Sequence, residues 1–401
     1  MPRIRFGKLQ GARVISLAAL VCLCACKEKN DKPDGGPGPG TEDVRKNVLS
    51  AAGTCVLTHA REFQTAAAAL ETATSALVSG PEASTRQAAR EAFHRAMDVW
   101  QVLEVLQIGP AATTLQPGGA EIRDNIYSWP LVNRCAVEEQ IVARGYESAS
   151  FPTTLVSRRG LNAMEYLLFY EGSDTACAAS SPIVSQGTWA ALSAEERDSR
   201  KRAYALAAAK EVRRHAERLV QAWEGGFAQT LETAGAGNTV YPTTQAALNS
   251  LSDALFYVEH DVKDLKLARP LGLRECTSDV CPEFLESRYA SRSKANLRSN
   301  LVGFRKLSEG CGQDFSGPGF DDLLVSVGAD TLAGKLRTNL IAAQAALEAI
   351  NEPDLDQALT QDKASVRAFY DALKAGTDLI KTEFVTTLDL ELPQSVEGDN
   401  D

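Results

Sequence analysis

The sequence lacks the short motifs that mark the common enzyme classes. It contains no His-Glu-x-x-His pair, no Gly-x-Ser-x-Gly elbow, no Walker loop and no Rossmann fingerprint. Aromatic residues make up only 6% of the chain, so it offers no ladder of rings on which polysaccharide or single-stranded nucleic acid would stack. The chain therefore carries no catalytic or nucleotide-binding pattern of these kinds.

Positive charge is also scarce. The chain has 52 acidic and 42 basic residues, and its formal net charge is −10. Nucleic-acid binding requires clustered Lys and Arg that displace counterions from phosphate, so nucleic acid is excluded as a partner. Broad adhesion to anionic lipid is disfavoured for the same reason. An acidic surface is compatible with cation binding, but it is also the usual basis of solubility.

Cys-x-x-Cys pairs are missing as well, which disfavours a zinc site built on cysteines. Three of the nine cysteines lie near the N-terminus, and an even number remains. We expect disulfides among these six, because the N-terminal segment described next indicates an oxidising compartment. Cys276 and Cys281 form the most local pair, and the connectivity is otherwise open among Cys55, Cys135, Cys177, Cys276, Cys281 and Cys311.

The N-terminus has the pattern of a lipoprotein signal peptide over residues 1–25. Basic residues precede an apolar run from Val14 to Ala25 that is too short to span a membrane. Leu23-Cys24-Ala25-Cys26 resembles a bacterial lipobox, in which Cys26 is the lipidated residue; the alternative is an ordinary secretory signal. The Gly- and Pro-rich residues 26–41 predict an extended tether. We expect a protein of the cell envelope, anchored on the periplasmic face, and Lys27 favours the outer membrane.

Hydrophobic periodicity predicts helices throughout the rest of the chain, and no stretch alternates with period two. About 360 residues exceed what one core usually serves, so we expect an all-α fold of two packed helical bundles. The predicted boundary is the loop at Gly235, which gives bundles at 42–235 and 236–392 and an acidic tail at 393–401. The predicted helices are 44–77, 81–107, 121–143, 153–170, 194–233, 243–265, 282–307, 329–350 and 361–388.

The most informative segment is 159–169, where two polar side chains interrupt an apolar helix. Asn162 and Glu165 share one face of that helix, beside a stripe formed by Leu161, Met164 and Leu168. The segment resembles the Gly-x-His-x-x-Glu motif of the imelysin family of helical envelope proteins, which are classed with the metallopeptidases and linked to iron uptake. Gly160 and Glu165 match that motif, and Asn162 stands at the position of its histidine.

The resemblance to an imelysin-like domain extends from about residue 45 to 390, because further segments follow in the family's order. It implies two bundles with a site where they meet, to which the motif helix contributes. The supporting segments are Trp100-Gln101 with Glu104, 123–130, 268–272, Glu286-Ser287 to Asn300, and 317–324. The resulting candidate ligand-binding residues are Asn162, Glu165, Arg123, Trp129, Glu286 and Ser287.

The substitution of the motif histidine changes the chemistry that the resemblance implies. An Asn amide oxygen suits hard cations such as calcium, whereas imidazole binds zinc, iron or copper and also serves as a general acid or base. We therefore favour a non-catalytic binding protein that serves iron uptake. The alternative is a metal-dependent peptidase with an altered site and Glu165 as ligand or base. A third interpretation is structural, in which Glu165 pairs with an arginine such as Arg123.

The remaining expectations concern cofactors and partners. We expect no tightly bound cofactor, although a metal ion or another small ligand is compatible with the site; the oligomeric state is open. His59 with Glu62, and His94 with Asp98, are expected to lie on solvated helix faces. His215 is expected on an exposed charged face. The acidic cluster around His260 is the best alternative cation site.

Overall fold

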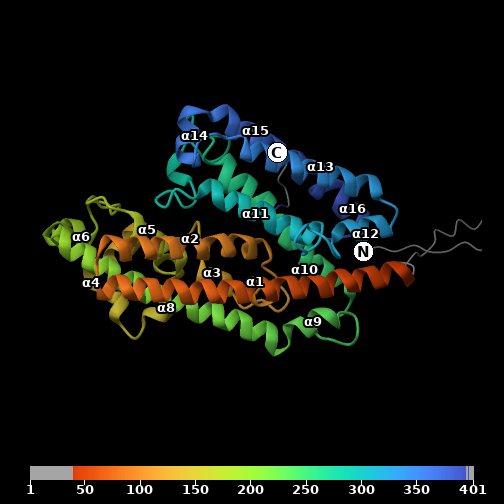
Figure 1. Ribbon diagram of the computed structural model, residues 1–401, viewed down its shortest axis with the longest axis horizontal. Coiled ribbons are helices and arrows are strands. Elements are labelled where there is room, and N and C mark those ends of the chain that lie inside the picture. The colour runs from red at the N-terminus through yellow and green to blue at the C-terminus, as the bar shows by residue number, and fades with distance from the viewer. Residues whose placement is uncertain (1–38, 394–395, 397–401) are drawn as a thin grey trace, which may run out of the picture. The chain divides into compact units, whose positions relative to one another are not determined.

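Helices make up the secondary structure of this computed structural model over the residues that it describes, 39–393 and 396, and no strand occurs among them (Figure 1). The expectation of an all-α fold is confirmed. The signal peptide, Cys26 and the tether before Pro39 lie outside the described residues, as does nearly all of the acidic tail. Among the described helices, none combines the length and the apolar character that crossing a bilayer would require.

The first half of the fold contains long helices and several short ones. Its elements are α1 (Pro39–Ser79), α2 (Ala83–Val105), η1 (Gly109–Ala111), α3 (Ile122–Ile126), α4 (Arg134–Ala143), η2 (Gly145–Glu147), η3 (Phe151–Thr153), η4 (Val156–Arg158), α5 (Gly160–Phe169), α6 (Pro182–Ser185), α7 (Thr188–Ala191), α8 (Ala194–Ala222), η5 (Trp223–Phe227) and α9 (Ala228–Glu232). Helix α1 packs along α2 and α8, and α5 packs against α8 and α2.

The second half begins after the loop at Gly235. Its elements are α10 (Thr244–Tyr257), η6 (Val258–Ala268), η7 (Pro282–Phe284), α11 (Ser293–Ser308), α12 (Phe320–Ser326), α13 (Asp330–Glu348), α14 (Leu355–Gln361), α15 (Lys363–Leu379), η8 (Ile380–Phe384) and α16 (Val385–Leu388). Helices α13 and α15 pack together, and α11 packs against α13 and η6. The segments η5, η6 and η8 have the wider turns of a π-helix.

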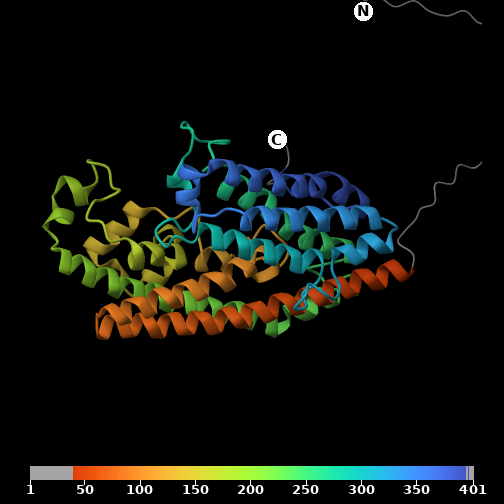
Figure 2. The ribbon, with the colours of Figure 1, turned by 45° about the horizontal axis from the view of Figure 1, so that its top comes forward.

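The two groups of helices pack against each other mainly through α2 and α11 (Figure 2). Buried apolar side chains from both groups form one continuous core. The predicted boundary at residues 235 and 236 lies in the loop between α9 and α10 and stays a prediction. The packing of α11 against α2 holds the irregular segment before α11 beside the first group of helices, where Gln101 of α2 donates to Glu286.

Two predicted helices are interrupted where the site forms. The predicted helix 121–143 is wrong at its centre, because Pro130 has no N–H to donate to a helix, and the chain forms α3 and α4 on either side. The predicted helix 282–307 begins only at Ser293. Ser287 and Ser291 have φ values of 51°, which a right-handed helix does not allow. Glu286 and Ser287 therefore lie in an irregular segment and not on a helix.

All six cysteines of the described residues form disulfides. The pairs are Cys55–Cys311, Cys135–Cys177 and Cys276–Cys281. The local pair expected from the sequence is present, and the first pair connects residues that are 256 positions apart, in α1 and in the loop after α11. That disulfide covalently joins the two groups of helices.

Candidate functional site

Helix α5 carries the motif and begins at Gly160, whose φ of +80° is one that L side chains rarely adopt. A Cβ atom at this position would lie 2.6 Å from the carbonyl oxygen of Ile126. Glycine is therefore required by both the backbone conformation and the close approach of α3. This contact sets where α5 starts, and hence where Asn162 and Glu165 lie, two and five residues later.

The Glu165 carboxyl group is buried, with 4% of the residue exposed. Its Oε1 accepts hydrogen bonds from the backbone N–H groups of Tyr289, at 2.7 Å, and Ala290, at 3.1 Å. Burial raises the pKa of Glu165 to about 8, although these two hydrogen bonds act in the opposite direction. At neutral pH the group is therefore mostly the neutral acid, which can donate a hydrogen bond as well as accept one.

Glu165 lines a pocket of about 390 Å³, called the α5 pocket below, to which both halves of the chain contribute. Its walls are formed by α5, the segment around Trp129 and the irregular segment that precedes α11. The lining residues are Trp129, Pro130, Val132, Arg134, Asn162, Glu165, Tyr166, Arg269, Glu283, Phe284, Leu285, Ser287, Arg288 and Tyr289. The pocket thus combines aromatic rings, three arginines and the polar residues of the motif.

Each of the three arginines has an exposed acidic partner. Arg134 pairs with Asp174 as well as with the buried Glu138, Arg288 with Asp356, and Arg269 with Glu275. The Arg269 guanidinium also stacks over the Phe284 ring at 4.0 Å. Exposed ion pairs contribute little free energy because water screens them. Arg269 and Arg288 can therefore exchange these partners for an anionic ligand in the pocket, whereas Arg134 also keeps its pair with the buried Glu138.

A buried polar network lies next to the pocket. Lys266, on η6, has 2% of its surface exposed, and its Nζ lies 2.9 Å from Glu286 and 3.7 Å from Glu104. It also donates to the side-chain oxygens of Gln101, at 2.8 Å, and Asn300, at 2.9 Å. This network joins α2, η6 and α11, so it holds the two groups of helices in register beside the pocket.

Arg123 extends the network through its ion pair with Glu104. It donates to Glu104 at 2.7 Å and to the carbonyl oxygen of Trp129 at 3.1 Å. Tyr127 donates to Glu286 at 2.7 Å. Arg123 therefore pairs with Glu104 and not with Glu165, whose acceptor contacts go to backbone N–H groups.

Comparison with known proteins then identifies the fold and the family. The family model described as Imelysin matches residues 56–380. The chain belongs to the imelysin family. It is 25% identical over 320 residues to iron-regulated protein A of Synechococcus elongatus, covering 78% of each chain.

Two crystal structures share the imelysin fold of this chain. An imelysin-like protein from Psychrobacter arcticum has a TM-score of 0.63 and 17% identity, covering 88% of this chain and 98% of its own. A protein described as an iron-regulated protein A precursor, from Parabacteroides distasonis, has a TM-score of 0.66 and 15% identity, covering 88% and 97%. At these identities the likeness concerns the fold alone.

The structure places four of the six candidate ligand-binding residues of this imelysin-family chain around the α5 pocket: Trp129, Asn162, Glu165 and Ser287. Arg123 and Glu286 do not line it; they belong to the adjacent buried network. Sequence analysis missed the contributions of Arg269, Tyr289 and Lys266. A lysine between Leu265 and Leu267 was the available signal for a buried charge, whereas the other two lie in irregular segments without periodicity.

The donor set around Glu165 does not fit a zinc or iron ion. Such sites require three or more His, Cys or carboxylate ligands. In the part of the chain that the structure describes, the side chains with three such atoms within 4.8 Å of one another are Cys55, His59 and Cys311, and Cys135, Glu139 and Cys177. Neither group includes Glu165. The family motif in this chain therefore does not assemble a transition-metal centre.

The histidines lie away from the α5 pocket. His59 and His215 are buried, so the expectation of exposed faces is wrong for both. His94 stacks on Phe169, with ring centroids 5.1 Å apart. His260 contacts Asp261 at 3.3 Å, in a pair that is only partly buried. Packing against neighbouring helices, which a single helix pattern does not reveal, accounts for the two buried imidazoles.

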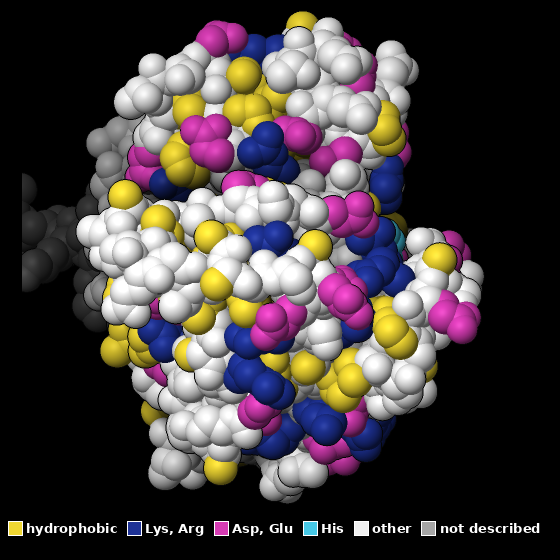
Figure 3. Space-filling view, turned by 90° about the vertical axis from the view of Figure 1, so that its left-hand side faces the viewer, with side chains coloured by type: hydrophobic (Ala, Val, Ile, Leu, Met, Phe, Trp, Pro, Cys, Tyr) yellow, Lys and Arg dark blue, Asp and Glu magenta, His cyan; other side chains and the backbone are white. Residues whose placement is uncertain are grey.

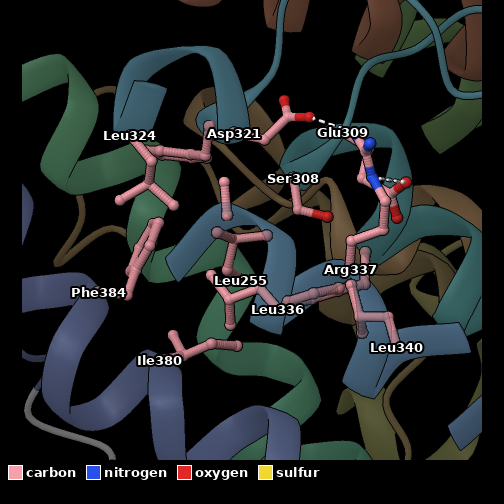
Figure 4. Close-up of a pocket in the computed structure, with 13 residues that line it drawn as sticks. Leu255, Ser308, Glu309, Asp321, Leu324, Leu336, Arg337, Leu340, Ile380 and Phe384 are labelled. Carbon is pink, nitrogen blue, oxygen red and sulfur yellow. Dashed lines mark hydrogen bonds and ion pairs between the residues drawn. The ribbon is translucent and has the colours of Figure 1, made fainter. Parts of the chain in front are cut away.

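Two other pockets contain neither Asn162 nor Glu165. Lys and Arg side chains gather on the end face shown in Figure 3. One of the two pockets is lined by basic residues that include Arg86, Arg90, Arg197 and Lys201. Arg86 and Arg90 there are paired with Asp198 and Glu171. An apolar cavity of about 20 Å³ lies in the second group of helices, with Leu324, Ile380 and Phe384 around it and the Arg337 ion pairs at its edge (Figure 4). That cavity holds no more than about one water.

Proposed function

We propose that this imelysin-family protein is a lipid-anchored, non-catalytic envelope protein that binds a small anionic ligand in the α5 pocket and thereby serves iron acquisition. The observation that carries the proposal is the lining of the pocket, where three arginines with exposed partners surround a carboxyl group that is mostly neutral. Arginine side chains form charge-assisted hydrogen bonds with anions, and the rings of the pocket supply apolar contact area.

The absence of a suitable donor set supports binding over peptide hydrolysis. A zinc peptidase needs metal ligands and a general base of suitable pKa. Asn162 supplies only a neutral amide. Glu165, with a pKa of about 8, is mostly protonated at neutral pH and has its Oε1 engaged by two N–H groups. We therefore assign Glu165 a role in orienting the ligand, with its neutral carboxyl group as a hydrogen-bonding partner.

The link to iron rests on relatives, one of which is named iron-regulated protein A. A ferric complex of a carboxylate chelator is one kind of anionic ligand that also carries iron. Its negative charge would meet Arg134, Arg269 and Arg288 in the α5 pocket. The proposed envelope location rests on the signal pattern before residue 26, and the three disulfides are typical of proteins from an oxidising compartment.

The test uses ferric citrate as the probe, with citrate alone for comparison, and measures binding to the mature chain by isothermal titration calorimetry. We expect saturable binding of the ferric complex and about tenfold weaker binding for Arg288→Ala, because one charge-assisted hydrogen bond contributes about 1.5 to 3 kcal/mol. Arg298→Ala is the matched control. Both arginine side chains are 42% exposed and pair with exposed carboxylates, but Arg298 does not line the pocket.

Three outcomes would count against this function. Binding that Arg288→Ala and Arg298→Ala weaken equally would place the ligand elsewhere. A lack of any heat on titration would exclude this class of ligand. Stoichiometric zinc in the purified chain, together with peptide hydrolysis that Glu165→Ala abolishes, would instead establish the peptidase.

A further inference from the structure

A second candidate site lies at the Cys55–Cys311 disulfide, and neither of these cysteines lines the α5 pocket. Cys55 and His59 are one turn apart on α1, so their side chains share a face of that helix. Cys311 comes from the loop after α11. The two sulfur atoms and one imidazole nitrogen lie within 4.8 Å of one another, and Cys55 and His59 are buried.

A carboxylate next to this cluster orients its imidazole ring. Nδ1 of His59 lies 2.7 Å from the Glu62 carboxylate, which leaves the Nε2 lone pair of the neutral ring available to a ligand. A carboxylate that orients a histidine in this way is the usual second layer of a protein zinc site. The cluster lines a groove of about 600 Å³ that also includes Thr58, Glu62, Lys306 and Gln313, so ions can reach it from solvent.

We propose that reduction of the Cys55–Cys311 disulfide creates a zinc site in which Cys55, Cys311 and His59 are the protein ligands. A thiol reductant, such as a protein dithiol, gives two electrons and two protons to the disulfide and becomes a disulfide itself. Zn²⁺ then displaces both protons from the new thiols. The ion is held by two thiolates and one imidazole, with water in the fourth position toward the groove.

The other disulfides show what distinguishes this one. Cys135 and Cys177 lie beside Glu139 but have no histidine in the group. Cys276–Cys281 does not occur in either cluster of three ligand atoms among the described residues. The Cys55 group alone combines two sulfurs, an imidazole and a second-layer carboxylate. The oxidised form is a covalent connection between α1 and the loop after α11, and the reduced form replaces that covalent connection with a metal ion.

The experiment uses Co²⁺ as a spectroscopic substitute for zinc, added to the mature chain with and without a phosphine reductant. We expect thiolate-to-cobalt charge-transfer bands and tetrahedral ligand-field bands only after reduction, with one ion per chain. The Cys55→Ser/Cys311→Ser variant should lose them, and the Cys135→Ser/Cys177→Ser variant is the matched control that should keep them. Glu62→Gln should weaken binding about 10- to 100-fold, as the loss of a second-layer partner does.

Far-ultraviolet circular dichroism on the same samples reports whether the helices persist. Reduced protein that keeps its helical signal but shows no thiolate band overturns the proposal. So do bands that His59→Gln leaves unchanged, since the imidazole would not be a ligand. Loss of the helical signal on reduction also overturns it, because the site requires α1 and the loop after α11 to remain in place. None of these results depends on which ligand occupies the α5 pocket.

Discussion

The Glu165 carboxyl oxygen accepts a hydrogen bond from the backbone N–H of Tyr289 at 2.7 Å. The two residues are 124 positions apart, one on α5 and the other in the irregular segment before α11. The motif glutamate of this imelysin-family chain therefore fixes the wall of its own pocket. Burial raises the pKa of the Glu165 carboxyl group, whereas the hydrogen bonds from Tyr289 and Ala290 act in the opposite direction.

The pKa of Glu165 predicts how stability depends on pH. Folding raises this pKa from an ordinary value of 4.5 to about 8, so between these values the folded state holds a proton that the unfolded state has released. The contribution of Glu165 is therefore fully present below about pH 4.5 and is lost as pH rises toward 8, with a slope of at most about 1.4 kcal/mol per pH unit.

Glu165→Gln should flatten that dependence, because glutamine is neutral at every pH and its amide oxygen can still accept from the two N–H groups. The measurement is urea unfolding of wild type and variant between pH 6 and pH 9. Equal slopes for the two proteins would show that the acid is ionised in the folded state throughout this range.

Removal of the charge of Lys266, the buried lysine of the network, should lower the stability of the fold strongly. Lys266→Met leaves Glu286 buried without this cation, while Glu104 keeps Arg123, and such a loss typically costs about 3 to 5 kcal/mol. Lys335→Met is the matched control, because Lys335 pairs with Glu383 where both side chains are about half exposed; such a pair contributes about 0 to 1 kcal/mol. Chemical denaturation at neutral pH compares the two variants, and similar losses would contradict the structural role of the network.

Two glycines with similar φ values allow the cost of a steric clash to be measured apart from the cost of the backbone conformation. Gly160 and Gly187 have φ values of +80° and +71°, but only at Gly160 would a Cβ meet another atom, the Ile126 carbonyl oxygen. Gly187→Ala should cost about 1 kcal/mol from conformation alone. Gly160→Ala should cost clearly more and should also weaken ligand binding, since α5 must shift. Thermal unfolding measures both variants, and equal melting temperatures would show that the backbone relaxes freely at α3.

Restoring the family histidine tests the metal hypothesis directly. Asn162→His would give α5 one imidazole and one carboxyl group, which is fewer than the three protein ligands of a zinc site. We expect the variant to bind zinc no more tightly than wild type when each competes with a chromophoric chelator. Stoichiometric, tightly held zinc in the variant would show that the rest of a metal centre is intact.

Local patterns predict much of this fold because helix periodicity is a property of neighbouring residues. The predicted helix 329–350 is α13, and 44–77 falls inside α1. The predictions were wrong around Trp129-Pro130, where the proline cannot continue a helix, and around Ser287, whose φ of 51° lies outside the right-handed helical region. These two segments are also the ones that form the pocket with α5.

The sequence by itself determined that this chain is helical and which helix carries the family motif, because spacing along one helix fixes the face that Asn162 and Glu165 share. The tertiary structure decided what those residues meet. Glu165 accepts a hydrogen bond from Tyr289, Arg123 pairs with Glu104, and His59 lies next to the Cys55–Cys311 disulfide. The Glu165–Tyr289 contact and the Cys55–Cys311 disulfide join positions 124 and 256 residues apart. The energetics of these contacts depend on burial and charge that only packing of the helices creates.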